Sequence, residues 1–158
     1  ERAMSAPRRD QPMPIGMDSS GLAHALRTDA NGRLELVLAS GGAYQQMLRH
    51  TVSGTLAVAA GALRYTNRAG AALTLREVHL AVNTAPAGAA IIVDVNLNGA
   101  SIFASPADRP QVAAGAYAGS SALIGTPAWA DNTYLTVDVD QVGSSTAGAN
   151  LVVTVVYG

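Results

Sequence analysis

The stretch from Ala71 to Leu97 constrains the fold most, because apolar and polar residues alternate along two long segments of it. In the second segment, 91–97, every odd-numbered position is apolar, whereas Asp94 and Asn96 occupy even-numbered positions. A period of two is typical of a β-strand with one face in a core. Asn98-Gly99 follows directly and favours a tight hairpin, since both residues tolerate positive φ.

The first segment changes its alternation midway. Leu75 is the last apolar residue at an odd position, Val78 is the first at an even one, and Arg76-Glu77 lies between them. A strand can keep one apolar face through such a shift only if it absorbs an extra residue. We therefore predict a β-bulge at Arg76-Glu77.

From Thr51 onward the chain alternates between short apolar segments and turn residues such as Gly, Pro and Asn-Gly. Only Tyr44 to His50 has helical character, about two turns at most. The expected strands cover 54–59, 62–67, 72–83, 89–97, 100–104, 111–124 (with an interruption), 133–141 and 150–157. This pattern predicts an all-β fold, an antiparallel β-sandwich of jelly-roll type. An immunoglobulin-like sandwich is the alternative, but its cysteine pair and tyrosine-corner pattern are missing.

We expect two regions, an extended N-terminal arm over 1–42 and the sandwich domain over 43–158. Three prolines between Pro7 and Pro14 exclude a helix at the start of the chain and favour an extended path. A disordered tail is one interpretation of this segment. The other is an arm that becomes ordered on a partner. We favour the arm, with Met13, Ile15 and Met17 as anchoring residues, because apolar side chains would serve no purpose on a solvated tail.

A short repeat follows the proline-rich segment. Asp18-Ser19-Ser20-Gly21 recurs eleven residues later as Asp29-Ala30-Asn31-Gly32. Both are turn signals, since Asp can cap its own turn and Gly accepts positive φ. A small meander of short β-hairpins is therefore expected here, as part of the arm.

Composition excludes several classes of protein and site. The formal net charge is −1, which argues against a nucleic-acid partner, because such proteins normally carry a basic stripe. The chain has no Cys and no Lys, which removes disulfides, thiolate sites and phosphate-binding Walker loops. No apolar run approaches the roughly 18 residues that span a bilayer, so no membrane partner is expected.

The last strand predicts contact with another subunit. In Leu151 to Tyr157 both faces are apolar, and Thr154 is the only polar residue. Such a strand is buried on both faces, although in a two-layer sandwich one face would meet water. Either a second subunit or a loop or the arm covers that face. We favour the subunit, with Val152, Thr154 and Val156 in the interface, and charged residues at only 13% agree with covered surface.

No residues form a recognisable catalytic or cofactor site. There is no G-x-S-x-G elbow, and His24, His50 and His79 lack the short spacings of metal sites. His79 is expected to face solvent or an interface. The only tryptophan, Trp129, is interpreted as a packing anchor rather than a sugar platform. We therefore expect neither an enzyme nor a cofactor.

A site for a hard cation, bound by oxygen ligands, is the one alternative to the absence of any site. Asp94, Asn96, Asp138 and Asp140 could converge if their strands are neighbours. Yet carboxylates that alternate with valines are typical of any half-exposed strand, so plain solvated surface is the favoured interpretation.

Residues 53–158 resemble a module common in structural proteins of tailed bacteriophages. The segments that carry the resemblance are Ser53–Val58, Leu63–Asn67, Val82–Gly88, Ile92–Gly99, Ile102-Phe103, Asp108-Arg109-Pro110, Tyr134–Ser144 and Leu151–Tyr157. The resemblance implies a virion component, found in minor tail proteins, fibres and head-decoration proteins, usually as β-rich homotrimers. It implies no catalytic residues.

Three functions follow as expectations. The favoured one is a trimeric capsid decoration or cement protein, whose arm binds the major capsid protein. The second is a minor tail, tail-fibre or adaptor protein in host attachment, which would bind other tail proteins. The third, a depolymerase, is weakest, because no paired carboxylates are marked. In the first two cases the protein would reside in the virion, assembled in the host cytoplasm.

Overall fold

The computed structural model describes residues 13–17, 23–28, 34–38, 45–121 and 124–158. The chain forms two compact units, Glu1–Ala43 and Tyr44–Gly158. In the first unit, β1 (Met13–Met17), β2 (Ala23–Thr28) and β3 (Leu34–Leu38) form an antiparallel sheet in the order β1-β2-β3. This order is that of a meander, as the two turn signals between the strands predict.

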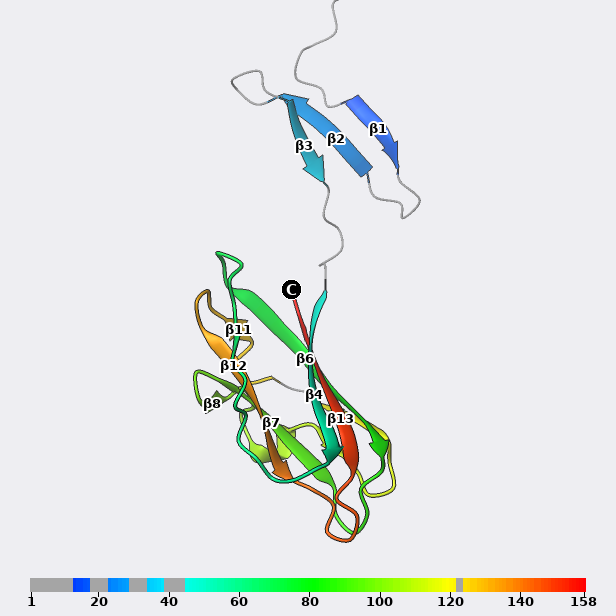
Figure 1. The fold of residues 1–158 in the computed structure, drawn as a ribbon. Helices are drawn as coiled ribbons and strands as arrows, with labels where there is room; N and C mark the ends of the chain where they lie inside the picture. Colours follow the sequence, from blue (N-terminus) through cyan, green and yellow to red (C-terminus); the bar gives the residue numbers. More distant parts are fainter. Residues whose placement is uncertain (1–12, 18–22, 29–33, 39–44, 122–123) are drawn as a thin grey trace, which may run out of the picture. The chain divides into compact units, whose positions relative to one another are not determined.

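The second unit consists of two antiparallel sheets (Figure 1). Sheet 1 has the order β10-β6-β13-β4, and β11 also pairs with β6. Sheet 2 has the order β5-β12-β7-β8, and β9 also pairs with β7. The strands of sheet 1 are β4 (Gln46–Thr55), β6 (Leu73–Thr84), β10 (Ala118–Ser121), β11 (Ala128–Trp129) and β13 (Ala149–Tyr157). Those of sheet 2 are β5 (Tyr65–Thr66), β7 (Ile91–Leu97), β8 (Ala100–Ser101), β9 (Gln111–Val112) and β12 (Tyr134–Gln141).

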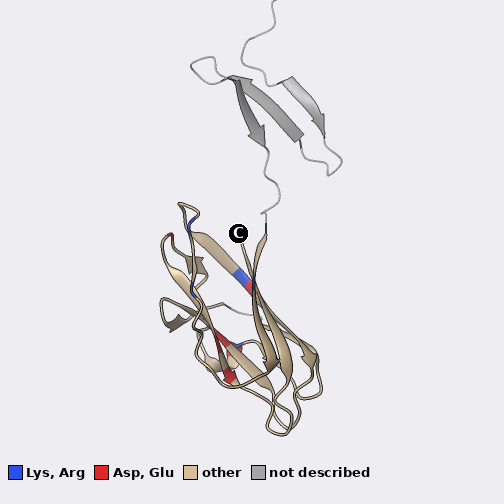
Figure 2. Ribbon diagram, viewed as in Figure 1, with Lys and Arg blue, Asp and Glu red and all other residues tan. Residues whose placement is uncertain are grey.

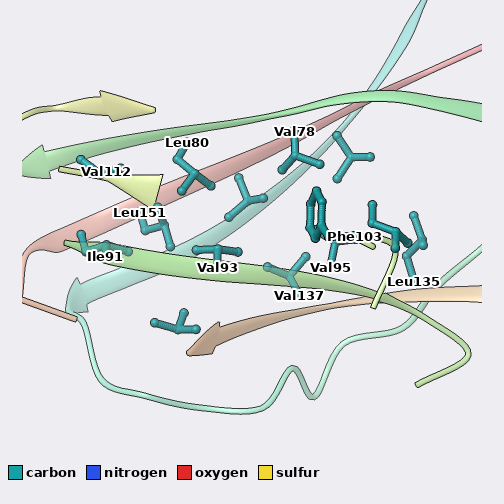
Figure 3. Packing of buried hydrophobic residues seen from close by; sticks show 14 of the residues in the cluster. Val78, Leu80, Ile91, Val93, Val95, Phe103, Val112, Leu135, Val137 and Leu151 are labelled. Atoms are coloured by element: carbon teal, nitrogen blue, oxygen red, sulfur yellow. The ribbon is translucent and has the colours of Figure 1, made fainter. Parts of the chain in front are cut away.

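The core lies between the two sheets and is aliphatic. In β7 and β12, Val93 pairs with Val139 and Val95 with Val137, and all four side chains are buried. Figure 3 shows Val93, Val95 and Val137 facing residues of sheet 1 such as Leu80 and Leu151. Because one face of each sheet supplies this core, the alternation in the sequence correctly predicts an all-β, sandwich-like fold.

Two local predictions are confirmed. Val156 of β13 pairs with Glu77, but Tyr157 pairs with Leu75, so Arg76 is the extra residue of a bulge. Both Arg76 and Glu77 are exposed, whereas Leu75 and Val78 on either side are buried. The Asn98-Gly99 turn between β7 and β8 has φ values of 51° and 86°.

The helical turn expected at Tyr44 to His50 is wrong, because β4 begins at Gln46. Within β4, His50 pairs with Val153 of β13, and Leu48 and Val52 are less exposed than their neighbours. Pairing along the whole length of β13 thus overrides a weak local preference for helix.

Several expected strands are shorter in the structure. Of the expected strand 54–59 only the first two residues are strand, at the end of β4, and of 62–67 only Tyr65–Thr66 is strand. Strand β8 ends at Ser101, within the expected 100–104. The interrupted strand over 111–124 is divided into β9 and β10, and residues 122–123 lie outside the described part. Strand β11 was not predicted, since its two residues carry no periodic pattern.

The two sides of the sandwich differ. On one side β10 approaches β9 so closely that a Cβ on Gly119 would lie 1.8 Å from the carbonyl oxygen of Gln111. On the other side β4 is the last strand of sheet 1. There the sheets meet at His50 and Tyr65, whose Nδ1 and hydroxyl oxygen are 2.8 Å apart. Glycine therefore permits close approach on one side, while a polar contact bridges the other.

Candidate functional site

The outer face of sheet 2 brings together the four polar residues that were considered as cation ligands. Asp94 and Asp138 are register partners on β7 and β12, and the Asn96 amide donates to Asp138 Oδ2 at 3.0 Å. Asp140 lies two residues further along β12. Figure 2 shows this acidic group on a body that otherwise carries few charges.

An arginine lies at the centre of this cluster. Arg109, which follows the short 3-10 helix η1 (Pro106–Asp108), donates through Nη2 to Asp94 Oδ2 at 2.9 Å and through Nη1 to Asp140 Oδ2 at 2.8 Å. The Ser101 hydroxyl donates to Asp94 Oδ1 at 2.7 Å, and the Gly61 amide donates to Asp138 Oδ1 at 2.7 Å. The guanidinium therefore occupies the position in which a bound cation would be expected.

The expectation that these outer faces are plain solvated surface is wrong for Asp94 and Asn96. Their exposed fractions are 5% and 9%. The segments that carry Ser101, Arg109 and Gly61 contact this face and exclude water from it. No period-two pattern could reveal this cover, because it comes from loops distant in sequence.

Negative charge remains in excess at the cluster, with three carboxylates around one guanidinium. The pKa of Asp140 is raised above its ordinary value of 3.8, chiefly because burial disfavours the charged form. Arg109 opposes this shift, and the carboxylates of Asp94 and Asp138 add to it. In the described part of the chain, no group of three or more His, Cys, Asp or Glu residues is placed to hold a metal ion. Through these ion pairs the cluster holds the loop that carries Arg109 against sheet 2.

The histidines have different environments. His50 is buried on β4 beside Tyr65, and burial lowers its pKa below 6.5. His79 is 49% exposed and lies 2.8 Å from Glu77, as expected for a solvent- or interface-facing residue. His24 belongs to β2, where the structure does not describe the side chains.

Trp129 is a packing anchor, as expected. Only 3% of it is exposed, its ring meets Tyr157 edge-on at 5.3 Å, and its Nε1 donates to the Thr133 carbonyl at 3.2 Å. Its own carbonyl accepts from the side chain of Asn67, which is 2% exposed. This buried asparagine joins the loops around 67–71 and 129–133, and the sequence analysis missed it.

The residues predicted for a subunit interface lie on the outer face of sheet 1. Val152 pairs with Thr51 and Ala81, Thr154 with Arg49 and His79, and Val156 with Met47 and Glu77. Val152 and Thr154 are half-buried. Val156 is only 5% exposed, so neighbouring side chains of the same chain already cover it.

The predicted anchoring residues Met13, Ile15 and Met17 all belong to β1, which pairs with β2. Their side chains lie outside what the structure describes. Arg109 was not predicted as a site residue. The sequence does hold an indication of its role, since Arg109 is the only Arg after Arg76 in a stretch with five aspartates.

Comparison with known proteins adds no assignment. No protein-family model, no curated protein and no solved structure matches this chain. No helix in the described ranges is long and apolar enough to cross a membrane.

Proposed function

We propose that this protein is a non-enzymatic structural subunit of a tailed-phage virion, most simply a trimeric capsid decoration protein with a jelly-roll body. The observation that carries the proposal is the order of the strands. The first four strands of the body alternate between the sheets: β4 in sheet 1, the short β5 in sheet 2, β6 in sheet 1 and β7 in sheet 2.

The same order places the first long strand of the body, β4, beside the last, β13. Such interleaving supports the proposed jelly roll, in which two Greek keys wrap around one core. Virion subunits are a frequent use of this architecture. A fold supports many functions, so the argument for a virion role also needs the resemblance of residues 53–158 to phage structural modules.

The division into two units supports anchoring by the N-terminal region. Residues 1–43 form a unit of their own, separate from the body that begins at Tyr44. A small three-stranded sheet buries little apolar surface, which favours a role on a partner over an independent one. The major capsid protein is the proposed partner, and Met13, Ile15 and Met17 the proposed anchoring residues.

The trimer is proposed to form with sheet 1 toward the threefold axis. Val152 and Thr154 on the inner strand β13 would then line the axis, with Val156 beside them under cover of its own chain, and the two edges of the sheet would approach neighbouring copies. The half-buried state of Val152 and Thr154 within one chain leaves surface for this contact.

Electron microscopy of virions from the phage that encodes the protein tests the proposal. Full-length protein should occupy trimeric positions on the capsid shell. A protein without residues 1–43 should remain folded but leave those positions empty. Density on the tail instead would support the alternative, a minor tail, fibre or adaptor protein, and absence from the particle would refute both.

A further inference from the structure

One side of the sandwich carries most of the exposed large hydrophobic residues in the described ranges. Met47 on β4 is 61% exposed, and Val58 and Leu63 in the segment after β4 are 64% and 58% exposed. That segment runs along β12, where Ala59 pairs with Val139, and returns to β4 through the contact of Tyr65 with His50. We call residues 46–63 the β4 side.

The backbone of the β4 side is also unusual. Strand β4 has ten residues and pairs only with β13, so its other edge has no strand partner in the described part of the chain. Natural edge strands are normally protected by charge, by proline or by covering segments. Strand β4 carries a single charged residue, Arg49, and the run from His50 to Leu63 contains no Arg, Lys, Asp, Glu or Pro. An edge with so little protection, next to exposed apolar side chains, is typical of a surface that another protein covers.

The fourth exposed large hydrophobic residue lies at the opposite edge of the same sheet. Tyr117, 62% exposed, directly precedes β10, and β10 and β4 are the two ends of sheet 1. The segment 113–121 around Tyr117 also lacks charged residues. Arg49 on β4, which pairs with Thr154, is the only charged residue of the two surfaces, so their apolar parts can meet without stranding a charge between them.

We propose that the β4 side of one copy docks against the Tyr117 side of a second copy. This inference rests on the trimer of the proposed function, because a threefold ring needs two different surfaces that fit each other. The contact places sheet 1 of each copy edge to edge with the next, around the axis that β13 lines. Tyrosine is well suited to the centre of such a contact, because it buries a large area with few rotatable bonds.

Charge substitutions test the two surfaces separately in the full-length protein. Leu63→Glu and Val58→Glu alter the β4 side, Tyr117→Glu alters the other side, and Ala107→Glu in η1 is a matched control at an exposed alanine. Analytical ultracentrifugation should show a trimer for the wild type and the control. Each of the other variants should raise the dissociation constant at least about tenfold. Thermal unfolding of each variant establishes that the fold is intact.

A mixing experiment distinguishes this contact from a symmetric one. Leu63→Glu retains an intact Tyr117 side, and Tyr117→Glu retains an intact β4 side. An equimolar mixture should therefore form a heterodimer through one intact contact, at concentrations where each variant alone is largely monomeric. A mixture without heterodimer, or a Tyr117→Glu protein that trimerises as the wild type does, would overturn the proposal.

Single cysteines provide a test without added charge, because the chain contains none. Ser53→Cys on β4 should be alkylated more slowly as the protein concentration rises, whereas Ala107→Cys should react at a constant rate. Equal rates at Ser53 across concentrations would overturn the inference, as would a wild type that stays monomeric. If these tests succeed but the protein is absent from virions, the proposed function fails while the docking surface stands.

Discussion

The outer face of sheet 2 carries Asp94, Asn96, Asp138 and Asp140, whereas the outer face of β13 in sheet 1 carries Val152, Thr154 and Val156. Sequence patterns predict water over the first face and a partner over the second. In the structure, Arg109 and the segments around it cover the polar face, and the apolar face is left half-open. The residue types on a strand therefore do not tell which face the chain itself will cover.

The largest loss of stability should come from removing the guanidinium of Arg109, which pairs with the carboxylates on the outer face of sheet 2. Arg109→Met leaves Asp94 buried beside two other carboxylates without their only cation. We expect a loss of about 2–4 kcal/mol in the free energy of unfolding, reduced from a fully buried pair because Arg109 is partly exposed. Chemical denaturation measures this loss. Arg76→Met, at an exposed arginine, is the control, and an equally small effect at both positions would mean that these ion pairs contribute no stability.

A smaller effect should separate the core face of a strand from its outer face. Val153→Ala, on the inner face of β13, removes two methyl groups from a fully buried site and should cost about 1–3 kcal/mol. Val152→Ala, on the half-buried face of β13, should cost about 1 kcal/mol or less in the monomer. Equal costs in monomeric protein would show that the chain itself covers both faces of β13.

The contact between His50 and Tyr65, which joins the two sheets, should make the stability of the protein depend on pH. His50 has a lowered pKa in the folded protein, so the unfolded chain binds the proton more readily. Its contribution to stability is present above the unfolded pKa of about 6.5 and is lost as the pH falls through it. His50→Gln should flatten this part of the curve of melting temperature against pH.

The smallest effect is expected for Asp140. Its raised pKa means that the folded state favours the protonated form, so its contribution to stability is lost as the pH rises from 3.8 through the folded pKa. Asp140→Asn should therefore slightly stabilise the protein at pH 7 and change little at pH 3. Strong destabilisation at pH 7 would show that the ion pair with Arg109 outweighs the burial of the carboxylate.

The candidate site was only partly predictable. Sequence analysis named Asp94, Asn96, Asp138 and Asp140 as a group that could converge, and the register of β7 and β12 does bring them together. It did not identify Arg109 as their partner, because η1 precedes it in an irregular loop with no period to follow. The contact between His50 and Tyr65 was not predicted either. His50 was expected in a helical turn, and Tyr65 in a strand with no assigned partner.

The sequence alone determined the features that depend on neighbouring residues. These are the alternation of 91–97, the positive-φ turn at Asn98-Gly99 and the bulge at Arg76, since each follows from side-chain direction and backbone sterics. Tertiary structure decided that 46–50 is strand and that Asp94 is buried. It also decided that β4 is the last strand of its sheet in the described part of the chain. These outcomes depend on contacts between segments far apart in the chain, whose free energies exceed the weak local preferences of the residues involved.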